Sequence, residues 1–256
     1  MTSLVVAQWV VALVGLAIAV AWARGVRAGR DPLGPAPRGD FPDMVVPLVV
    51  ALAAWAGTNV AVPMLVPAAA RGPAFTLCLA AIALALLPIV VSRWPRSEVP
   101  LARQVGAGVY GGIATFGIVA VIAEAVQTIV SLVGHQIPVQ SVVKSAAQAS
   151  GSAALLAALM AVVLAPFAEE VFYRGLLLAT LARTSPPRTA ITVQAVIFGL
   201  AHVIGRPEQL PLAIPLAAVG WCAGWLALRT RSIGPAILVH ATFNAIQFAF
   251  IRLGAA

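Results

Sequence analysis

The sequence predicts an all-α protein: a polytopic membrane bundle of about eight transmembrane helices, forming a single domain over residues 1–256. Of the 256 residues, 61% are hydrophobic and 9% are charged, whereas a soluble domain carries about a quarter charged residues. The mean hydropathy is +1.00. Because a spanning helix needs about 20 mostly apolar residues, the apolar segments predict spans near residues 4–23, 43–66, 74–92, 105–133, 150–182, 188–204, 209–229 and 233–253.

The basic residues predict how these spans are oriented. Loops rich in arginine and lysine stay on the cytoplasmic side of a membrane. If the N-terminus lies outside, four basic residues also fall outside, Arg174 lies within a span, and every other basic residue is cytoplasmic. The cytoplasmic set is Arg24, Arg27, Arg30, Arg38, Arg93, Arg96, Arg103, Arg183, Arg188, Arg229 and Arg231, and the outer set is Arg71, Lys144, Arg206 and Arg252. Both termini are therefore predicted outside, and the net charge of +8 is read as a topology signal and not as a nucleic-acid surface.

The first four spans carry few reactive groups. The first is kept as a span and not a signal peptide, because its basic residues follow it. Trp22 and Trp94 are expected in the headgroup zone. Glu124 stands alone in the fourth span, where it either forms a hydrogen bond within the bundle as a protonated acid or lines a substrate path.

Glycine and cysteine residues of the spans are assigned to packing. Gly108 and Gly112 in the fourth span have the four-residue spacing that lets membrane helices approach closely, and so do Gly220 and Gly224 in the seventh. The two cysteines, Cys78 and Cys222, lie in different predicted spans. Neither a disulfide framework nor a cysteine metal site is therefore predicted.

The fifth span holds an unusual cluster of charge. Glu169, Glu170 and Arg174 follow an apolar run, and ionisable groups at such depth cost at least ~2.5–3.5 kcal/mol each, so they indicate a functional site. Glu170 and Arg174 have the spacing of a self-neutralising helix pair, which leaves Glu169 unexplained. Pro166 lacks an N–H and is expected to loosen the helix one turn before Glu169.

Polar residues also interrupt the sixth and eighth spans. Phe198 precedes His202 by one turn, and Gly205 with Pro207 predicts that the helix ends close to His202. His240 and Asn244 share one face of the eighth span. At a rise of ~1.5 Å per residue, Glu169, His202 and Asn244 lie about 20 Å from the nearest cytoplasmic arginine and His240 about 14 Å. The four groups are therefore predicted to meet near the middle of the membrane.

A carboxylate, two imidazoles and an amide suit hydrolysis. A carboxylate and an imidazole can take a proton from water, while imidazole and amide donors can stabilise an oxyanion. Glu169, His202 and His240 could equally hold a divalent metal such as zinc. The residue pattern leaves open whether the cofactor is a metal or none, and the role of Glu124.

These residues resemble the motifs of the CPBP family, which comprises type II CAAX prenyl endopeptidases and bacteriocin-processing or Abi proteins. The resemblance lies within about residues 150–250, in Glu169-Glu170-x-x-x-Arg174, Phe198-x-x-x-His202 and His240-x-x-x-Asn244. It implies an intramembrane endopeptidase in which Glu169 is the general base, His202 helps to activate water, and His240 and Asn244 stabilise the oxyanion. Glu170 and Arg174, with Phe198, would support that site.

The expected substrate is a membrane-embedded or lipidated peptide or protein in contact with the bilayer. Fifteen arginines against one lysine and the many alanines are typical of a GC-rich bacterial genome, which predicts a bacterial plasma membrane and makes prenylation of the substrate doubtful. Two rival hypotheses remain. One is an ion- or proton-coupled transporter, because intramembrane Glu and His also relay protons, and the other is a non-catalytic membrane scaffold of the Abi type.

Overall fold

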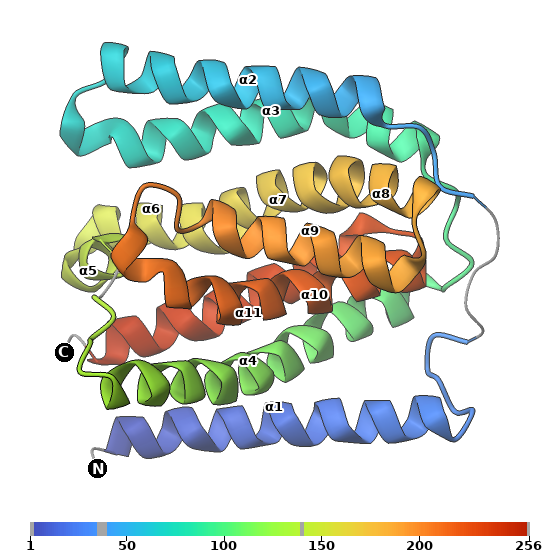
Figure 1. The fold of residues 1–256 in the computed structure, drawn as a ribbon, viewed down its shortest axis with the longest axis horizontal. Helices are drawn as coiled ribbons and strands as arrows, with labels where there is room; N and C mark the ends of the chain where they lie inside the picture. The colour runs from blue at the N-terminus through green and yellow to red at the C-terminus, as the bar shows by residue number, and fades with distance from the viewer. Residues whose placement is uncertain (1–2, 35–39, 139–140, 255–256) are drawn as a thin grey trace.

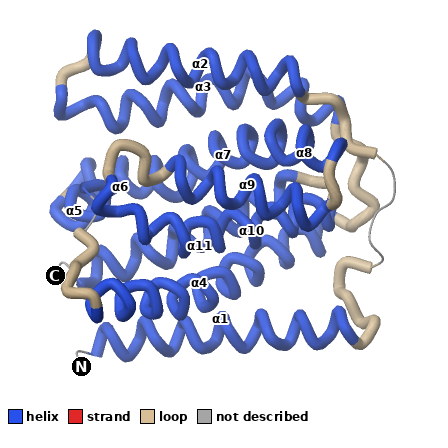
Figure 2. Tube along the Cα trace, viewed as in Figure 1, coloured by secondary structure: helices blue, strands red, loops and turns tan. Residues whose placement is uncertain are grey.

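The protein, described by a computed structural model over residues 3–34, 40–138 and 141–254, is a bundle of helices with loops at its two ends (Figure 1). No strand occurs in these ranges (Figure 2). Within them, seven helices or continuous helical runs are long and apolar enough to cross a membrane, and a further apolar helix is shorter. The predicted all-α membrane bundle is confirmed.

The helices follow one another along the chain with short connections, and the symbol η marks 3-10 and π segments. The first half of the chain forms α1 (Ser3–Arg27), α2 (Val45–Leu65), η1 (Ala68–Ala70), α3 (Arg71–Arg93), α4 (Leu101–Leu132) and α5 (Ser141–Gln148). The second half forms α6 (Gly151–Leu159), η2 (Met160–Leu164), α7 (Ala165–Glu170), η3 (Val171–Leu178), α8 (Ala179–Thr184), α9 (Pro187–Ala201), η4 (Pro207–Leu212), α10 (Ala213–Thr230) and α11 (Ile233–Gly254).

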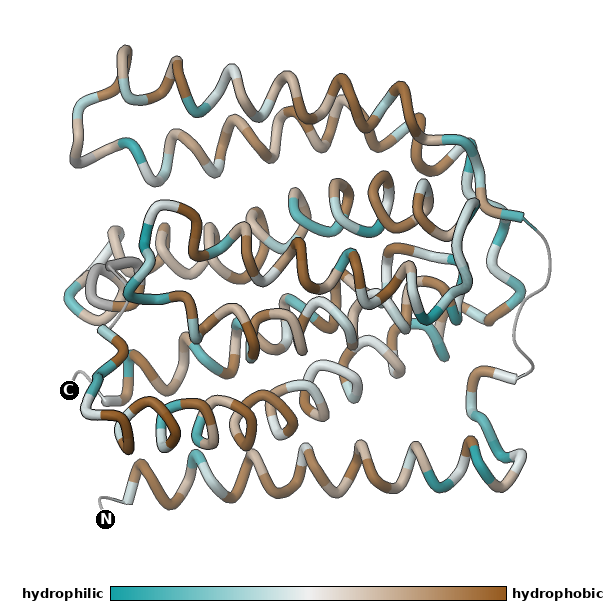
Figure 3. Tube along the Cα trace, viewed as in Figure 1, coloured by the Kyte–Doolittle hydropathy of each residue, from teal (hydrophilic) through white to brown (hydrophobic). Residues whose placement is uncertain are grey.

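The arrangement places the fifth span at the centre. The continuous run from α6 to α8 lies between the α2–α3 hairpin on one side and α9, α10 and α11 on the other, and α1 packs on the outer face of α4 (Figure 1). Large apolar side chains such as Leu65, Leu132 and Leu155 are exposed on the outside, as lipid contact requires. Figure 3 shows hydrophilic residues at the helix ends and within the α6–α8 run.

The orientation of the chain agrees with an even number of crossings. α1 begins and α11 ends at the same end of the bundle (Figure 1). Arg38 lies outside the described residues, as does the side chain of Lys144. Which end faces the cytoplasm stays a prediction.

Glycines bring the helices close together, as predicted. A Cβ on Gly112 of α4 would meet Thr242 and the carbonyl of Val239 on α11 at 2.5–2.9 Å. On α10, a Cβ on Gly220 would lie 3.0 Å from the Cα of Ala195 on α9. α11 and α9, which carry His240 and His202, are therefore each fixed against a neighbour by backbone contact.

One expectation from the sequence needs correction. The sixth span, expected at 188–204, is the 15-residue α9, whose length of about 22 Å is less than the ~30 Å hydrocarbon core. It ends at Ala201, and a turn that contains Gly205, with a left-handed φ of +75°, follows before η4. Trp94, at the C-terminal end of α3, is 8% exposed, and its Nε1–H donates to the carbonyl of Gly175 across 3.0 Å; its place in the headgroup zone stays a prediction.

Candidate active site

The helical run that carries the two glutamates is interrupted twice by π-helical turns, at Met160–Leu164 and Val171–Leu178. Such wide turns are rare, and they occur frequently at functional sites. One lies just before α7 and the other just after it, so that Glu169 and Glu170 occupy the last positions of a six-residue α-helical segment. The predicted loosening of the helix near Pro166 therefore takes the form of a π turn.

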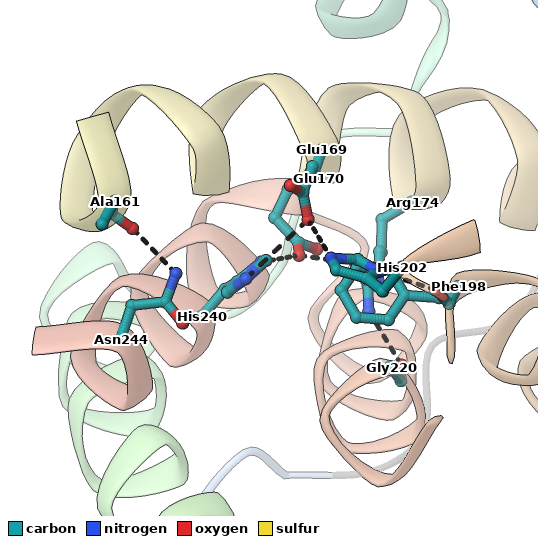
Figure 4. Close-up of polar contacts among 9 residues, drawn as sticks. All are labelled: Ala161, Glu169, Glu170, Arg174, Phe198, His202, Gly220, His240 and Asn244. Carbon is teal, nitrogen blue, oxygen red and sulfur yellow. Dashed lines mark hydrogen bonds and ion pairs between the residues drawn. The ribbon is translucent and has the colours of Figure 1, made fainter. Parts of the chain in front are cut away.

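Pro166 leaves one carbonyl of this π turn without a helical donor. The N–H of Ala165 bonds to the carbonyl of Met160, five residues earlier. The same pattern would pair residue 166 with the carbonyl of Ala161, but proline has no N–H. The side chain of Asn244 on α11 supplies the missing donor, because its Nδ2 lies 2.7 Å from the carbonyl oxygen of Ala161 (Figure 4).

Glu169 faces both histidines. Its Oε2 lies 3.4 Å from Nε2 of His202 and 3.9 Å from Nε2 of His240. The three side chains come from α7, the end of α9 and α11, and they converge on one point (Figure 4). Asn244 lies one turn further along α11, where its amide is engaged by Ala161.

The hydrogen bonds behind the two imidazoles decide which nitrogen faces Glu169. Nδ1 of His202 lies 2.8 Å from the carbonyl oxygen of Phe198, which can only accept, so Nδ1 carries a proton. Nδ1 of His240 lies 2.8 Å from Oε1 of Glu170. Because Glu170 is ion-paired, it also accepts, and Nδ1 of His240 carries a proton as well. Both Nε2 atoms are thereby left to face the site.

Glu170 and Arg174 form a buried ion pair that holds His240 in place. Nη1 of Arg174 lies 2.5 Å from Oε1 of Glu170, and both side chains are 0% exposed. Nη2 of the same guanidinium donates to the carbonyl of Gly220 across 3.0 Å. The predicted helix pair is thus observed, and in addition it binds His240 on α11 and the backbone of α10.

The ring of Phe198 is the apolar centre of this cluster. The guanidinium of Arg174 lies 4.8 Å from its centroid, within the range of a cation–π contact. Tyr173, His202 and His240 pack around the same ring, with centroids at 4.9, 4.5 and 5.7 Å. Phe198 therefore fixes both histidines and the arginine relative to one another.

The side chains of the site differ in how far they are exposed. The side chains of His202 and Glu169 are 29% and 22% exposed, whereas those of His240 and Glu170 are 6% and 0% exposed. Oε2 of Glu169 nevertheless accepts no hydrogen bond from the described residues. A ligand or substrate would therefore reach the site from the side of Glu169 and His202.

Three side chains of the site are of metal-binding types. Glu169, His202 and His240 are the kinds of side chain that bind zinc, and their Nδ1 partners resemble those behind zinc-bound histidines. However, the described part of the chain contains no group of three or more His, Cys, Asp or Glu placed to hold a metal ion.

Two polar residues outside the motifs differ sharply in their surroundings. Glu124 is exposed on α4 and is not buried within the bundle, which removes the first of its two interpretations. Gln194 is 0% exposed one turn before Phe198, and neither atom of its amide has a partner among the described residues. Gln194 belongs to none of the three motifs, and the signal for it in the sequence is an amide within an apolar helix.

Comparison with known proteins identifies the C-terminal region. The family described as type II CAAX prenyl endopeptidase Rce1-like matches residues 151–246, which include α6 to α10, most of α11 and every residue of the site. No curated protein and no solved structure matches the chain. The family match confirms, for residues 151–246, the resemblance drawn from the three motifs.

Proposed function

We propose that this chain hydrolyses peptide bonds of membrane-embedded or lipidated substrates, with Glu169 as general base and no covalent intermediate. The observation that carries the proposal is the convergence of Nε2 of His202 and Nε2 of His240 on one oxygen of Glu169, at 3.4 and 3.9 Å. A buried carboxylate oxygen requires a donor. A water molecule bound there is held by the group that removes its proton.

The protonation pattern assigns different roles to the two histidines. When His202 is neutral with its proton on Nδ1, its Nε2 accepts from the same water molecule that Glu169 deprotonates. His240 donates to the ionised Glu170 from Nδ1, so its Nε2 is a donor when the ring is an imidazolium. The negative charges of Glu169 and Glu170 are then balanced by the positive charges of Arg174 and His240. Buried charges are normally paired in this way because an unpaired buried charge is costly.

The reaction follows from these positions. Glu169 takes a proton from water, and the resulting hydroxide forms a bond to the scissile carbonyl carbon. The oxyanion is stabilised by Nε2–H of His240 and by the second amide hydrogen of Asn244, since the first is donated to Ala161. Glu169 then returns its proton to the amide nitrogen, the C–N bond breaks, and an amine and a carboxylic acid leave.

The decisive experiment compares two glutamates. Purified Glu169→Gln protein, reconstituted in vesicles, should cleave fluorogenic lipopeptides ~100 to 10,000-fold more slowly than wild type, the usual contribution of a general base. Glu98→Gln is the matched control, because Glu98 is exposed in the connector between α3 and α4 and belongs to none of the three motifs. Undiminished cleavage by Glu169→Gln, in protein that remains folded, would refute the proposal.

The same preparations separate the rival functions. Proton or ion flux across wild-type vesicles that is lost in Glu169→Gln, without any cleavage, would favour a transporter. Full biological activity of both the Glu169 and His202 variants would favour a scaffold. Prenylated and unprenylated forms of the same peptide, assayed side by side, test whether the lipid group is required.

A further inference from the structure

A second site lies away from the active centre, between α1 and α4. The two helices touch where Gly15 and Gly117 let their backbones meet, and from there they separate toward the end at which α1 stops and α4 begins (Figure 1). A cavity of about 870 Å³ occupies this wedge, bounded by both helices and by the connector after α1. None of its lining residues belongs to the active centre or to the matched family region.

The rim of the cavity carries uncompensated positive charge. Arg30 of the connector and Arg103 of α4 both line it, and neither forms an ion pair within the described ranges. Asp31 lines it too, but its carboxylate is already engaged. Oδ2 lies 2.6 Å from Nη2 of Arg229, and Oδ1 accepts the N–H of Leu33 at 2.9 Å. The cavity therefore presents two arginines to an anion.

An indole ring forms part of the cavity wall. Nε1 of Trp22 is buried and has no hydrogen-bond partner among the described residues, although buried polar atoms normally have one. The indole ring packs edge-on against Trp225, with centroids 5.7 Å apart, so its orientation is fixed. Trp22 itself lines the cavity.

Below these polar groups the lining is apolar. Ile18 and Ala21 of α1 and Ala107 and Tyr110 of α4 line the inner part. Tyr110 lies seven residues beyond Arg103, or about 10 Å deeper along the helix. The cavity is thus cationic at the membrane surface and apolar beneath it.

We propose that this cavity binds one anionic phospholipid. The phosphate is held by Arg30 and Arg103 through charge-assisted hydrogen bonds, and the start of an acyl chain lies along Ala107 and Tyr110. Basic pockets between membrane helices recognise lipid headgroups in this way. A free phosphate ion would leave the apolar part of the cavity unfilled.

The test is native mass spectrometry of the full chain in detergent, titrated with phosphatidylglycerol or phosphatidylcholine. Wild type should bind one phosphatidylglycerol at least ~10-fold more tightly than phosphatidylcholine. The double variant Arg30→Gln/Arg103→Gln should weaken phosphatidylglycerol binding by about 30-fold. The matched control, Arg24→Gln/Arg27→Gln, removes the same charge from the end of α1 without touching the cavity lining.

A second variant tests the cavity itself. A Cβ on Gly106 would meet no atom within 4 Å, so Gly106→Leu should fill the cavity, keep the thermal stability of wild type and abolish the preference for phosphatidylglycerol. Gly57→Leu, which also points into open space on α2, is its control. Equal losses in test and control variants, an unchanged affinity in Arg30→Gln/Arg103→Gln, or displacement of the lipid by millimolar inorganic phosphate would each overturn the proposal.

Discussion

The side-chain amide of Asn244 on α11 donates a hydrogen bond, 2.7 Å long, to the carbonyl of Ala161. Pro166 cannot donate to this carbonyl because proline has no N–H. The polar residue in the last span thus supplies the hydrogen bond that the distorted helix of the fifth span lacks. Removing the amide leaves a carbonyl within the membrane without a donor, and this costs about 1–3 kcal/mol.

Asn244→Ala is therefore expected to lower stability by that amount, measured by thermal unfolding in detergent, and to slow peptide cleavage. Pro166→Ala restores a backbone N–H, so the loss of stability should be smaller in the Asn244→Ala/Pro166→Ala double variant. The double-mutant cycle isolates this coupling. Asn59→Ala is the control, because Asn59 donates to its own helix at an exposed position; strict additivity in the cycle would contradict the contact.

The two adjacent glutamates should respond differently to the same substitution. Glu170→Gln breaks an ion pair whose members are 0% exposed, and losing one partner of such a pair costs about 3–5 kcal/mol. Glu169→Gln removes a side chain that forms no hydrogen bond with the described residues through Oε2. We expect both variants to lose cleavage activity but only Glu170→Gln to unfold at a markedly lower temperature. Equal melting temperatures would show that Glu170 does not support the fold.

The position of His202 depends on the contact between α9 and α10. A Cβ on Gly199 would lie 3.0 Å from the backbone nitrogen of Ala217 and would collide with the carbonyl of Ala213. Gly199→Ala should therefore separate the helices, with a cost of about 1–3 kcal/mol, and reduce cleavage because His202 is one turn away. Gly57→Ala, at an open position on α2, should leave melting temperature and activity unchanged or slightly raise stability.

An ion pair at one end of the bundle should make stability depend on pH. The N–H of Val45, and then the guanidinium of Arg183, hold the pKa of the Asp43 carboxyl below its ordinary value. Because the folded pKa is the lower one, the stabilisation is present above the unfolded value of about 3.9 and is lost as the pH falls through the folded pKa. Melting temperatures of wild type and Asp43→Asn should therefore differ at pH 6 and converge in acid. A difference that persists in acid would exclude this ion pair as the cause.

Much of this architecture could be predicted from the residues. The spans follow from apolar length, and the meeting of Glu169 with His202 and His240 follows from equal depth along separate helices. The loosening near Pro166 could be predicted, but its π-helical form and the hydrogen bond from Asn244 could not, because they depend on how the helices pack. Nor could the bond from His240 to Glu170, since depth does not determine which way a side chain points. α9 looked longer than it is because its apolar character continues into the turn that follows it.

One contact at the far end of the chain bears on how the protein is made. Nη1 of Arg252, near the end of α11, lies 2.6–3.0 Å from the carbonyls of Ala146, Ala147 and Ala149, at and just beyond the end of α5. Terminal carbonyls of a helix need such donors. Arg252 is synthesised about a hundred residues after these alanines. A nascent chain that is halted before Arg252 would therefore lack the donor for the carbonyls at the end of α5.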